Sequence, residues 1–170
     1  WRPYRSVEEV RACEAMEAAS VPLSTVFDVV YGLRTGDNGR HVARSPGPVP
    51  LVGGEDVSAY DRRWKPKSLR EPEAFPVLLP KQLGRWKIGL QRIRSNSTRP
   101  WRRWLEGALL GPDEVGLDSL SLVAERGAGR SDAPSDRLLA LLGLLGSAPL
   151  DRWYKLHFTD VNVKPHYLGD

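Results

Sequence analysis

Hydrophobic and polar residues alternate along this chain with two periods, and the helical period is clearest near the N-terminus. Apolar residues recur there at every third position among charged residues, which predicts a helix over residues 7–19. Ser6 followed by Glu9 is the capping-box pattern that begins such a helix, and Pro22 lies beyond its end. The apolar stripe consists of Val7, Val10, Cys13 and Met16.

A second helical region lies toward the C-terminus. The pair Ser135-Asp136 precedes a strongly apolar segment, residues 137–145, and Gly146 follows it, so capping and composition predict a helix between them. Residues 150–158 form an amphipathic pattern that predicts a further helix.

The middle of the chain carries short strand patterns instead. Residues 23–31 are rich in β-branched and aromatic residues, and residues 86–93 alternate in a way that predicts a half-buried strand. Residues 62–76 are polar and proline-containing, which predicts a long surface loop. Residues 51–60 predict a short strand, a turn, and then another short strand or helical turn, and residues 77–81 predict a buried strand running into a loop. Further extended segments are predicted at residues 41–43, 108–110 and 119–123.

Short strands followed by two helices predict an α+β fold, with a mixed, largely antiparallel sheet of short strands and C-terminal helices. We expect residues 1–22 to be a helical segment or a linker from a preceding domain, and residues 23–170 to form one domain. The chain begins at Trp1 and ends at Asp170 without a closing helix, so we expect a C-terminally truncated fragment of a longer protein.

Composition limits the possible classes. Hydrophobic residues make up 41% of the chain, enough for a core, and the longest apolar run is far shorter than the roughly 20 residues of a membrane span. The single cysteine, Cys13, cannot form a disulfide within the chain, which favours a cytoplasmic location. Together with the scattered His41, His157 and His166, it lacks the spacing of a zinc site.

Charge is segregated along the chain. Residues 61–104 contain thirteen Lys and Arg against three acids, a net charge of +10, whereas the whole chain carries only +4. This distribution favours a face that binds a polyanion. The alternative interpretation is a solvated, arginine-rich surface.

Catalytic motifs are not evident in the sequence. The loop at residues 32–39 lacks the Lys-Ser/Thr of a phosphate-binding P-loop, and the chain has no Gly-x-Ser-x-Gly elbow. It also lacks the Asn/Asp-Pro-Pro-aromatic motif with which adenine methyltransferases hold a flipped base. We therefore expect no catalysis by this chain alone, although Asp113 and Glu125 leave a metal-dependent nuclease as an alternative.

Two segments carry candidate binding residues. In the glycine-rich loop 32–39, Arg34 and Thr35 can contact phosphates, and Asn38 can bond to local backbone. In the segment 81–104, arginine, lysine, asparagine and serine are side chains that bind phosphates or read base edges. The candidates there are Lys81, Arg92, Arg94, Arg99 and Arg102 as cations, and Asn96 and Ser97 as neutral base readers.

The tryptophans of residues 81–104 suggest an alternative function. Trp86, Trp101 and Trp104 could stack on bases in a non-specific module for single-stranded DNA or RNA. Tryptophans are more often core anchors than stacking platforms.

The order of several motifs resembles the TaqI-like C-terminal specificity domain of N6-adenine DNA methyltransferases. The family's strand and Gly-Ile-x-Thr-Gly-x-Asn loop corresponds to residues 30–38, and its hydrophobic-x-Gly-x-Asp-hydrophobic-x-x-Tyr element to residues 51–60. Gly146 stands where the family's Leu-Leu-x-Leu-Leu-Asn-Ser helix has Asn, which is a departure. The remaining matches are Leu79-Pro80-Lys81, residues 87–93, residues 118–122 and the Asn-Val-x-Pro-x-x-Leu segment at residues 162–168.

The resemblance covers residues 23–170 and implies a function shared between two domains. This domain would recognise double-stranded DNA, and a catalytic domain of the same chain would bind S-adenosylmethionine and methylate an adenine flipped from the duplex. The parent would be a methyltransferase or a fused restriction–modification enzyme. The residues expected to contact DNA are Arg34, Thr35, Asn38, Lys81, Arg92, Arg94, Asn96, Ser97, Arg99 and Arg102.

Overall fold

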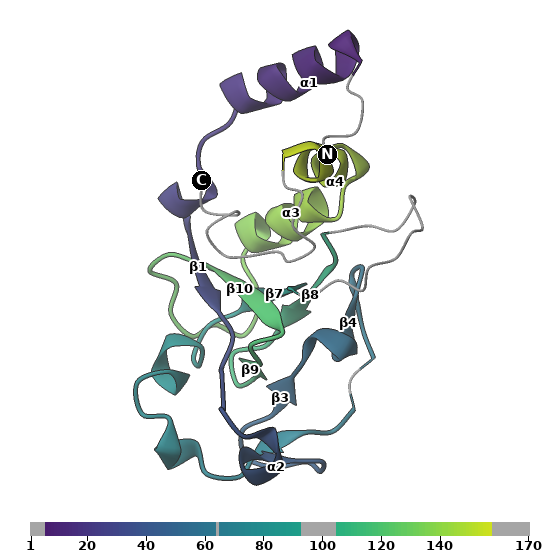
Figure 1. Cartoon of the computed structure of the whole chain (residues 1–170). Helices are drawn as coiled ribbons and strands as arrows, with labels where there is room; N and C mark the ends of the chain where they lie inside the picture. Colours follow the sequence, from purple (N-terminus) through teal and green to yellow (C-terminus); the bar gives the residue numbers. More distant parts are fainter. Residues whose placement is uncertain (1–5, 64, 93–104, 158–170) are drawn as a thin grey trace.

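The computed structural model describes residues 6–63, 65–92 and 105–157 of the chain. Within them lies one four-stranded antiparallel sheet with the strand order β1-β10-β7-β8, accompanied by three two-stranded pairs. Helices α1, α3 and α4 gather at one end of the molecule and the short helix α2 lies at the other, with the sheet between them (Figure 1). The predicted α+β class, with largely antiparallel short strands and C-terminal helices, is confirmed.

The sheet contains the longest strands of the described chain. It is built from β1 (Phe27–Tyr31), β7 (Lys87–Gln91), β8 (Gly107–Leu110) and β10 (Leu120–Glu125). The short pairs are β2 (Val42–Ala43) with β6 (Ser68–Leu69), β4 (Val57–Ser58) with β5 (Asp61–Arg62), and the parallel pair β3 (Leu51–Val52) with β9 (Val115–Gly116).

Side chains alternate between the two faces along every strand of the four-stranded sheet. Both faces are buried because other elements pack against each of them. Ile88, Leu90 and Val123 point to the face covered by α3 and α4, where Leu138 and Tyr154 complete the cluster. The opposite face packs in a second cluster against β3 and β4, made of Val52, Val57, Ala108, Leu110, Leu120 and Leu122. The predicted strand at residues 86–93 is therefore fully buried over Lys87–Leu90 and not half-buried.

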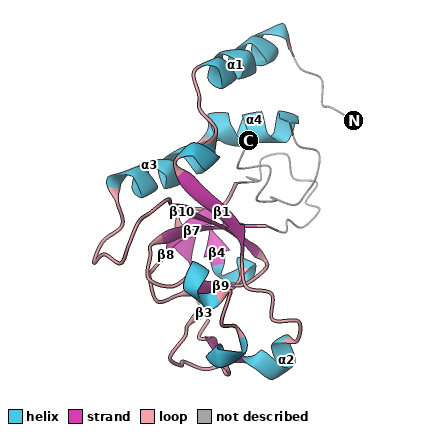
Figure 2. Ribbon diagram, turned by 90° about the vertical axis from the view of Figure 1, so that its left-hand side faces the viewer, coloured by secondary structure: helices cyan, strands magenta, loops and turns pink. Residues whose placement is uncertain are grey.

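The helices begin where their capping residues predict. In α1 (Val7–Ala18), Ser6 and Glu9 form a complete capping box, and in α3 (Asp136–Leu145) the Ser135 hydroxyl accepts from the Leu138 amide. The last helix, α4, spans Ala148–His157. Of the predicted stripe on α1, only Cys13 is buried and Val7 is 63% exposed. Figure 2 shows that α1 lies beyond α4, at the edge of the helical layer.

Two predictions about the middle of the chain are wrong. Residues 77–81, predicted as a buried strand, form a turn and the 3₁₀ helix η4 (Leu79–Lys81), with Val77 65% exposed. Pro76 and Pro80 lack the amide hydrogens that a strand ladder needs, which explains the difference. The predicted loop at residues 62–76 contains β6 and the 3₁₀ helix η3 (Pro72–Ala74).

The first predicted strand is also shorter than expected. Residues 23–25 form the 3₁₀ helix η1 (Leu23–Thr25), and extended structure begins only at Phe27. The remaining 3₁₀ helix, η2 (Gly54–Asp56), joins β3 to β4. In the described part of the chain, no helix has both the length and the apolar character that a membrane crossing needs.

Candidate nucleic-acid interface

The glycine-rich loop after β1 is fixed by backbone hydrogen bonds to the last residue of β9 and to the segment that follows it. The Leu33 amide donates to the Gly116 carbonyl at 2.7 Å, and the Asp118 amide donates to the Leu33 carbonyl at 2.9 Å. Gly32 makes this approach possible, since a Cβ at this position would lie 1.9 Å from the Leu117 oxygen. The loop is therefore held on a rigid part of the fold.

Beyond Leu33 the loop turns into the short helix α2 (Asn38–His41). Gly36 adopts a φ of +76°, in the left-handed region, and the Asp37 carboxylate caps α2 by accepting from the Arg40 amide. The predicted extended segment at residues 41–43 is thus β2 preceded by this helix. The Thr35 hydroxyl donates to the Asn38 amide oxygen at 2.5 Å, so the Asn38 side chain is oriented by the loop itself.

Three of the predicted contact residues line one small pocket of about 250 Å³, which we call the loop pocket. It is formed by Arg34, Thr35, Gly36, Asn38 and Asp118. Its donors are the Arg34 guanidinium and the Asn38 amide, and its acceptors include the Asp118 carboxylate. Within the described residues, neither the Arg34 guanidinium nor the Asp118 carboxylate has a partner. The pocket thus presents both kinds of hydrogen-bonding group to a ligand.

Arg92, which directly follows β7, contacts Asp118, one of the residues that line this pocket. Its Nη1 donates to the Asp118 carbonyl at 2.8 Å, and its guanidinium lies 4.8 Å above the Tyr31 ring. Its Nε is buried and has no hydrogen-bond partner among the described residues. The structure therefore brings Arg92 close to the loop that carries Arg34, Thr35 and Asn38, from which it is far apart in sequence. Lys81, by contrast, is exposed on η4 and does not line the loop pocket.

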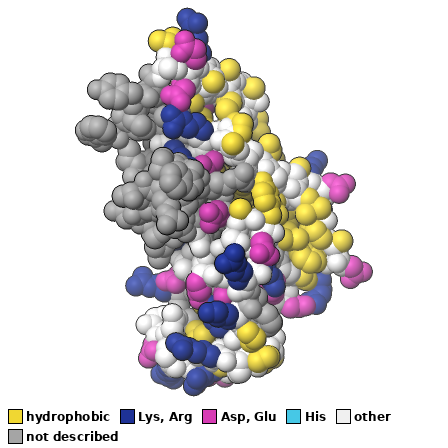
Figure 3. Space-filling model, turned by 90° about the vertical axis from the view of Figure 1, so that its right-hand side faces the viewer, with side chains coloured by type: hydrophobic (Ala, Val, Ile, Leu, Met, Phe, Trp, Pro, Cys, Tyr) yellow, Lys and Arg dark blue, Asp and Glu magenta, His cyan; other side chains and the backbone are white. Residues whose placement is uncertain are grey.

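A second, larger pocket of about 770 Å³ adjoins the loop pocket, and Asn38 lines both. We call it the basic pocket. Its cations are Arg44, Lys65, Lys67 and Arg70, and Glu55 is its single acid among the described residues. Figure 3 shows Lys and Arg side chains gathered at the end of the molecule that carries α2. None of these four residues was predicted as a contact from the sequence, although three of them lie within residues 61–104, where the charge is +10.

Lys67 is the one cation of the basic pocket whose charge is used within the fold. Its ammonium group forms ion pairs with Glu55 and with the buried Asp56, whose carboxylate lies 2.7 Å away. Burial alone would lower the pKa of Lys67, but hydrogen bonds to Asp56 and Glu55 outweigh it and raise the pKa. Asp56 also accepts from the Gly53 amide. Its ion pair with Lys67 joins η2 to the residue that precedes β6.

The other three cations of the basic pocket are available to a ligand. Arg44, Lys65 and Arg70 are exposed, and within the described chain no acid or hydrogen-bond acceptor contacts their charged groups. Three exposed cations beside one already-paired acid give this pocket an uncompensated positive charge, as a polyanion site requires.

Within the described chain, three cations of residues 61–104 form ion pairs with acids from other parts of the sequence: Arg62, Lys67 and Arg85. Arg62 forms an ion pair with Glu114, and Arg85 with Asp28 at 2.9 Å. The hydrogen bond from Arg85 is the main reason that the pKa of Asp28 is lowered. The count of three acids within residues 61–104 therefore leaves out acids from other segments that pair with Arg62, Lys67 and Arg85.

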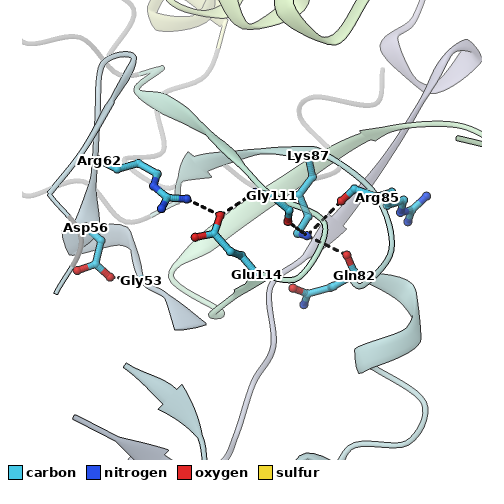
Figure 4. A network of polar contacts seen from close by, with 8 residues as sticks. All are labelled: Gly53, Asp56, Arg62, Gln82, Arg85, Lys87, Gly111 and Glu114. Carbon is cyan, nitrogen blue, oxygen red and sulfur yellow. Dashed lines mark hydrogen bonds and ion pairs between the residues drawn. The ribbon is translucent and has the colours of Figure 1, made fainter. Parts of the chain in front are cut away.

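Lys87 is buried and cannot contact a ligand. Its ammonium donates to the carbonyls of Gln82 (2.8 Å), Gly111 (3.0 Å) and Arg85 (3.3 Å), as Figure 4 shows. Burial lowers the pKa of Lys87 to about 8. The neighbouring Glu114 contacts the Gly111 amide and Arg62, which closes the network.

The alternative nuclease site gains no support from the arrangement of the carboxylates. Asp113 forms an ion pair with Arg130 at 2.9 Å, and Glu125 accepts from the Ser135 hydroxyl. No group of three or more metal-ligating side chains occurs among the described residues.

Of the three tryptophans in the stacking alternative, Trp86 lies in the described part of the chain. Trp86 packs half-buried against the core beneath α3, and its indole N–H donates to the Ser131 carbonyl at 3.0 Å. These contacts are those of a core anchor. Trp101 and Trp104 lie outside the described residues, as do Arg94, Asn96, Ser97, Arg99 and Arg102.

Comparisons of the sequence with protein-family models and with curated proteins found no match.

Proposed function

We propose that this chain is a sequence-specific recognition domain for double-stranded DNA, which acts beside the catalytic domain of an adenine-N6 DNA methyltransferase or a fused restriction–modification enzyme. In that enzyme S-adenosylmethionine would bind the catalytic domain, and this chain would select the site. The observation that carries the proposal is that the loop pocket lies beside the basic pocket, with Asn38 lining both. Residues able to read bases thus lie next to uncompensated cations.

The chemistry of the two pockets fits DNA better than a small ligand. Arg44, Lys65 and Arg70 extend from three separate segments, so their charges are spread along a surface and are not concentrated at one point. Phosphate contacts of this kind supply affinity and register but no sequence information. The motif order that resembles the specificity domains supports the same proposal, because the glycine-rich loop carrying Arg34, Thr35 and Asn38 is one of the matching elements.

Binding of random-sequence duplex, measured by fluorescence anisotropy over a range of salt concentrations, tests the electrostatic part. Each lost phosphate contact should reduce the slope of log K against log salt by about 0.9. The triple variant Arg44→Ala/Lys65→Ala/Arg70→Ala should therefore lower the slope by roughly 2 to 3 and weaken binding.

The control variant is Arg11→Ala/Arg126→Ala/Arg137→Ala, which removes the same charge from exposed residues that line neither pocket. It should leave the slope nearly unchanged. The wild-type chain should also select one short motif from a random duplex pool. Equal effects of the two triple variants, or a preference for single strands, would contradict the proposal.

A further inference from the structure

The two adjoining pockets differ in charge, and this difference separates two modes of DNA contact. The basic pocket has three exposed cations, and its single described acid is already paired with Lys67. The loop pocket instead contains Asp118, whose carboxylate has no partner in the described chain. A free carboxylate repels phosphate, so the loop pocket is poorly suited to hold the backbone.

A free carboxylate is well suited to a base edge. The exocyclic amino groups of cytosine and adenine are donors in the major groove, and acidic side chains accept from such groups. Guanine and thymine present carbonyl acceptors at the equivalent major-groove positions, which a carboxylate would repel. The donors beside Asp118, on Arg34 and Asn38, can bond to the acceptors of the same or the next base pair.

Position 118 is also held more firmly than an ordinary surface loop residue. Its amide donates to the Leu33 carbonyl at 2.9 Å, and its carbonyl accepts from Arg92, which in turn lies over the Tyr31 ring. The backbone is thus fixed on both sides while the carboxylate has no partner within the described residues. A fixed backbone and a free acceptor are what discrimination between bases requires, because the geometry is set before the ligand arrives.

We infer that Asp118 is a specificity-determining residue, which accepts a hydrogen bond from the amino group of an adenine or a cytosine in the DNA site. This inference rests on the proposed function and adds a residue that sequence analysis did not select. It also assigns separate roles to the two pockets: the loop pocket reads bases, and Arg44, Lys65 and Arg70 hold phosphates.

The test compares Asp118→Ala with Asp132→Ala, which removes the same charge from an exposed residue outside both pockets. Each protein is used to select duplexes from a random pool, and its affinity is then measured for the wild-type motif and for every single-base-pair change. Asp118→Ala should lose about tenfold in discrimination at one adenine or cytosine position. Its affinity for random duplex and its salt dependence should not fall, since a negative charge has been removed.

The outcomes separate the inference from the proposed function. If the wild-type chain selects no motif, the proposed function fails and the inference fails with it. If the wild type selects a motif and Asp118→Ala keeps the same preference at every position, only the inference is overturned.

Thermal unfolding of each variant checks that it is folded. Asp118→Asn provides a second test, because it keeps an acceptor oxygen without the charge. It should retain more discrimination at that position than Asp118→Ala. An unchanged preference in both variants would refute the role of Asp118.

Discussion

The sheet–helix region and the region around α2 are stabilised in different ways. In the first, alternating apolar side chains fill clusters on both faces of a four-stranded sheet. In the second, two-stranded pairs enclose a smaller apolar cluster, and backbone contacts, a capped four-residue helix and a buried ion pair hold the surface. The region with the smaller core is the one that exposes the candidate DNA-contact residues.

Two lysines, the half-buried Lys67 and the buried Lys87, show the same contrast. Lys67, in the α2 region, is paired with carboxylates that raise its pKa, whereas Lys87, in the sheet, donates to carbonyls and has a pKa lowered to about 8. Carboxylates stabilise the charged form of Lys67, whereas burial in the sheet disfavours the charged form of Lys87. We therefore expect substitutions in the sheet to act on stability, and substitutions near α2 to act on both stability and binding.

The largest expected loss of stability comes from the helical layer. Leu138 on α3 is 1% exposed, and Leu138→Ala should cost roughly 3 to 4 kcal/mol of unfolding free energy, because it removes apolar contacts and leaves a cavity. Urea denaturation measures this effect. The neighbouring Leu139 is 44% exposed, so Leu139→Ala should change stability by less than about 1 kcal/mol. Equal losses in the two variants would argue against the packing described for α3.

The corresponding change near α2 breaks the buried ion pair. Asp56→Ala should cost about 3 kcal/mol, since it leaves the Lys67 ammonium largely buried without its main partner. It should also weaken binding of duplex DNA, because η2 and the basic pocket lose a shared support. In the double variant Asp56→Ala/Lys67→Met part of the stability should return. A simple sum of the two single effects would mean that the pair is not coupled.

Lys87 gives a pH-dependent prediction for the sheet. Between pH 8 and its ordinary pKa of 10.5, the unfolded chain keeps the Lys87 proton and the folded chain releases it, so rising pH favours folding. Below pH 8 both states are protonated and the contribution is constant. Stability relative to Lys87→Met should therefore rise by roughly 2 to 3 kcal/mol across this window. Urea denaturation of both proteins from pH 7 to 10.5 measures it, and a constant difference would show that burial does not shift this group.

The smallest expected effects compare the caps of the two regions. Ser135→Ala should cost about 1 kcal/mol of unfolding free energy, because the Leu138 amide loses its acceptor at the start of α3. Asp37→Ala removes the cap of α2, a helix of only four residues, and should cost less stability. Its main consequence should be weaker DNA binding, since Asn38 follows the cap directly. If Ser135→Ala weakened DNA binding as much as Asp37→Ala does, the two regions would not act separately.

Local sequence patterns predicted the features that depend on neighbouring residues. Ser6 and Ser135 cap helices as expected, and the alternation at residues 87–91 gave a strand. The pattern could not show that both faces of this strand are covered, because the covering elements come from elsewhere in the chain. The apolar run at 77–81 suggested a strand, but Pro76 before it and Pro80 within it prevent one.

The candidate site was predictable only in part for the same reason. Arg34, Thr35 and Asn38 were identified from one loop, and they do line one pocket. Asp118, Arg44 and the roles of Lys65 and Arg70 depend on contacts between distant segments. Gly146 illustrates the limit well, because a Cβ there would lie 2.0 Å from the hydroxyl of Tyr60, a residue far away in the sequence.

The hydrogen bonds of residues 116–118 also have a consequence for how the surface is assembled. Leu117 donates to Val52 while Gly116 and Asp118 bond to Leu33, so three segments separated by up to 85 positions must meet before the loop pocket exists. Contacts of such long sequence separation form slowly and late in folding. A peptide copied from residues 30–41 should therefore have none of the binding of the whole chain. During synthesis, the chain would acquire the candidate DNA-contact surface only after residues 116–118 have been made.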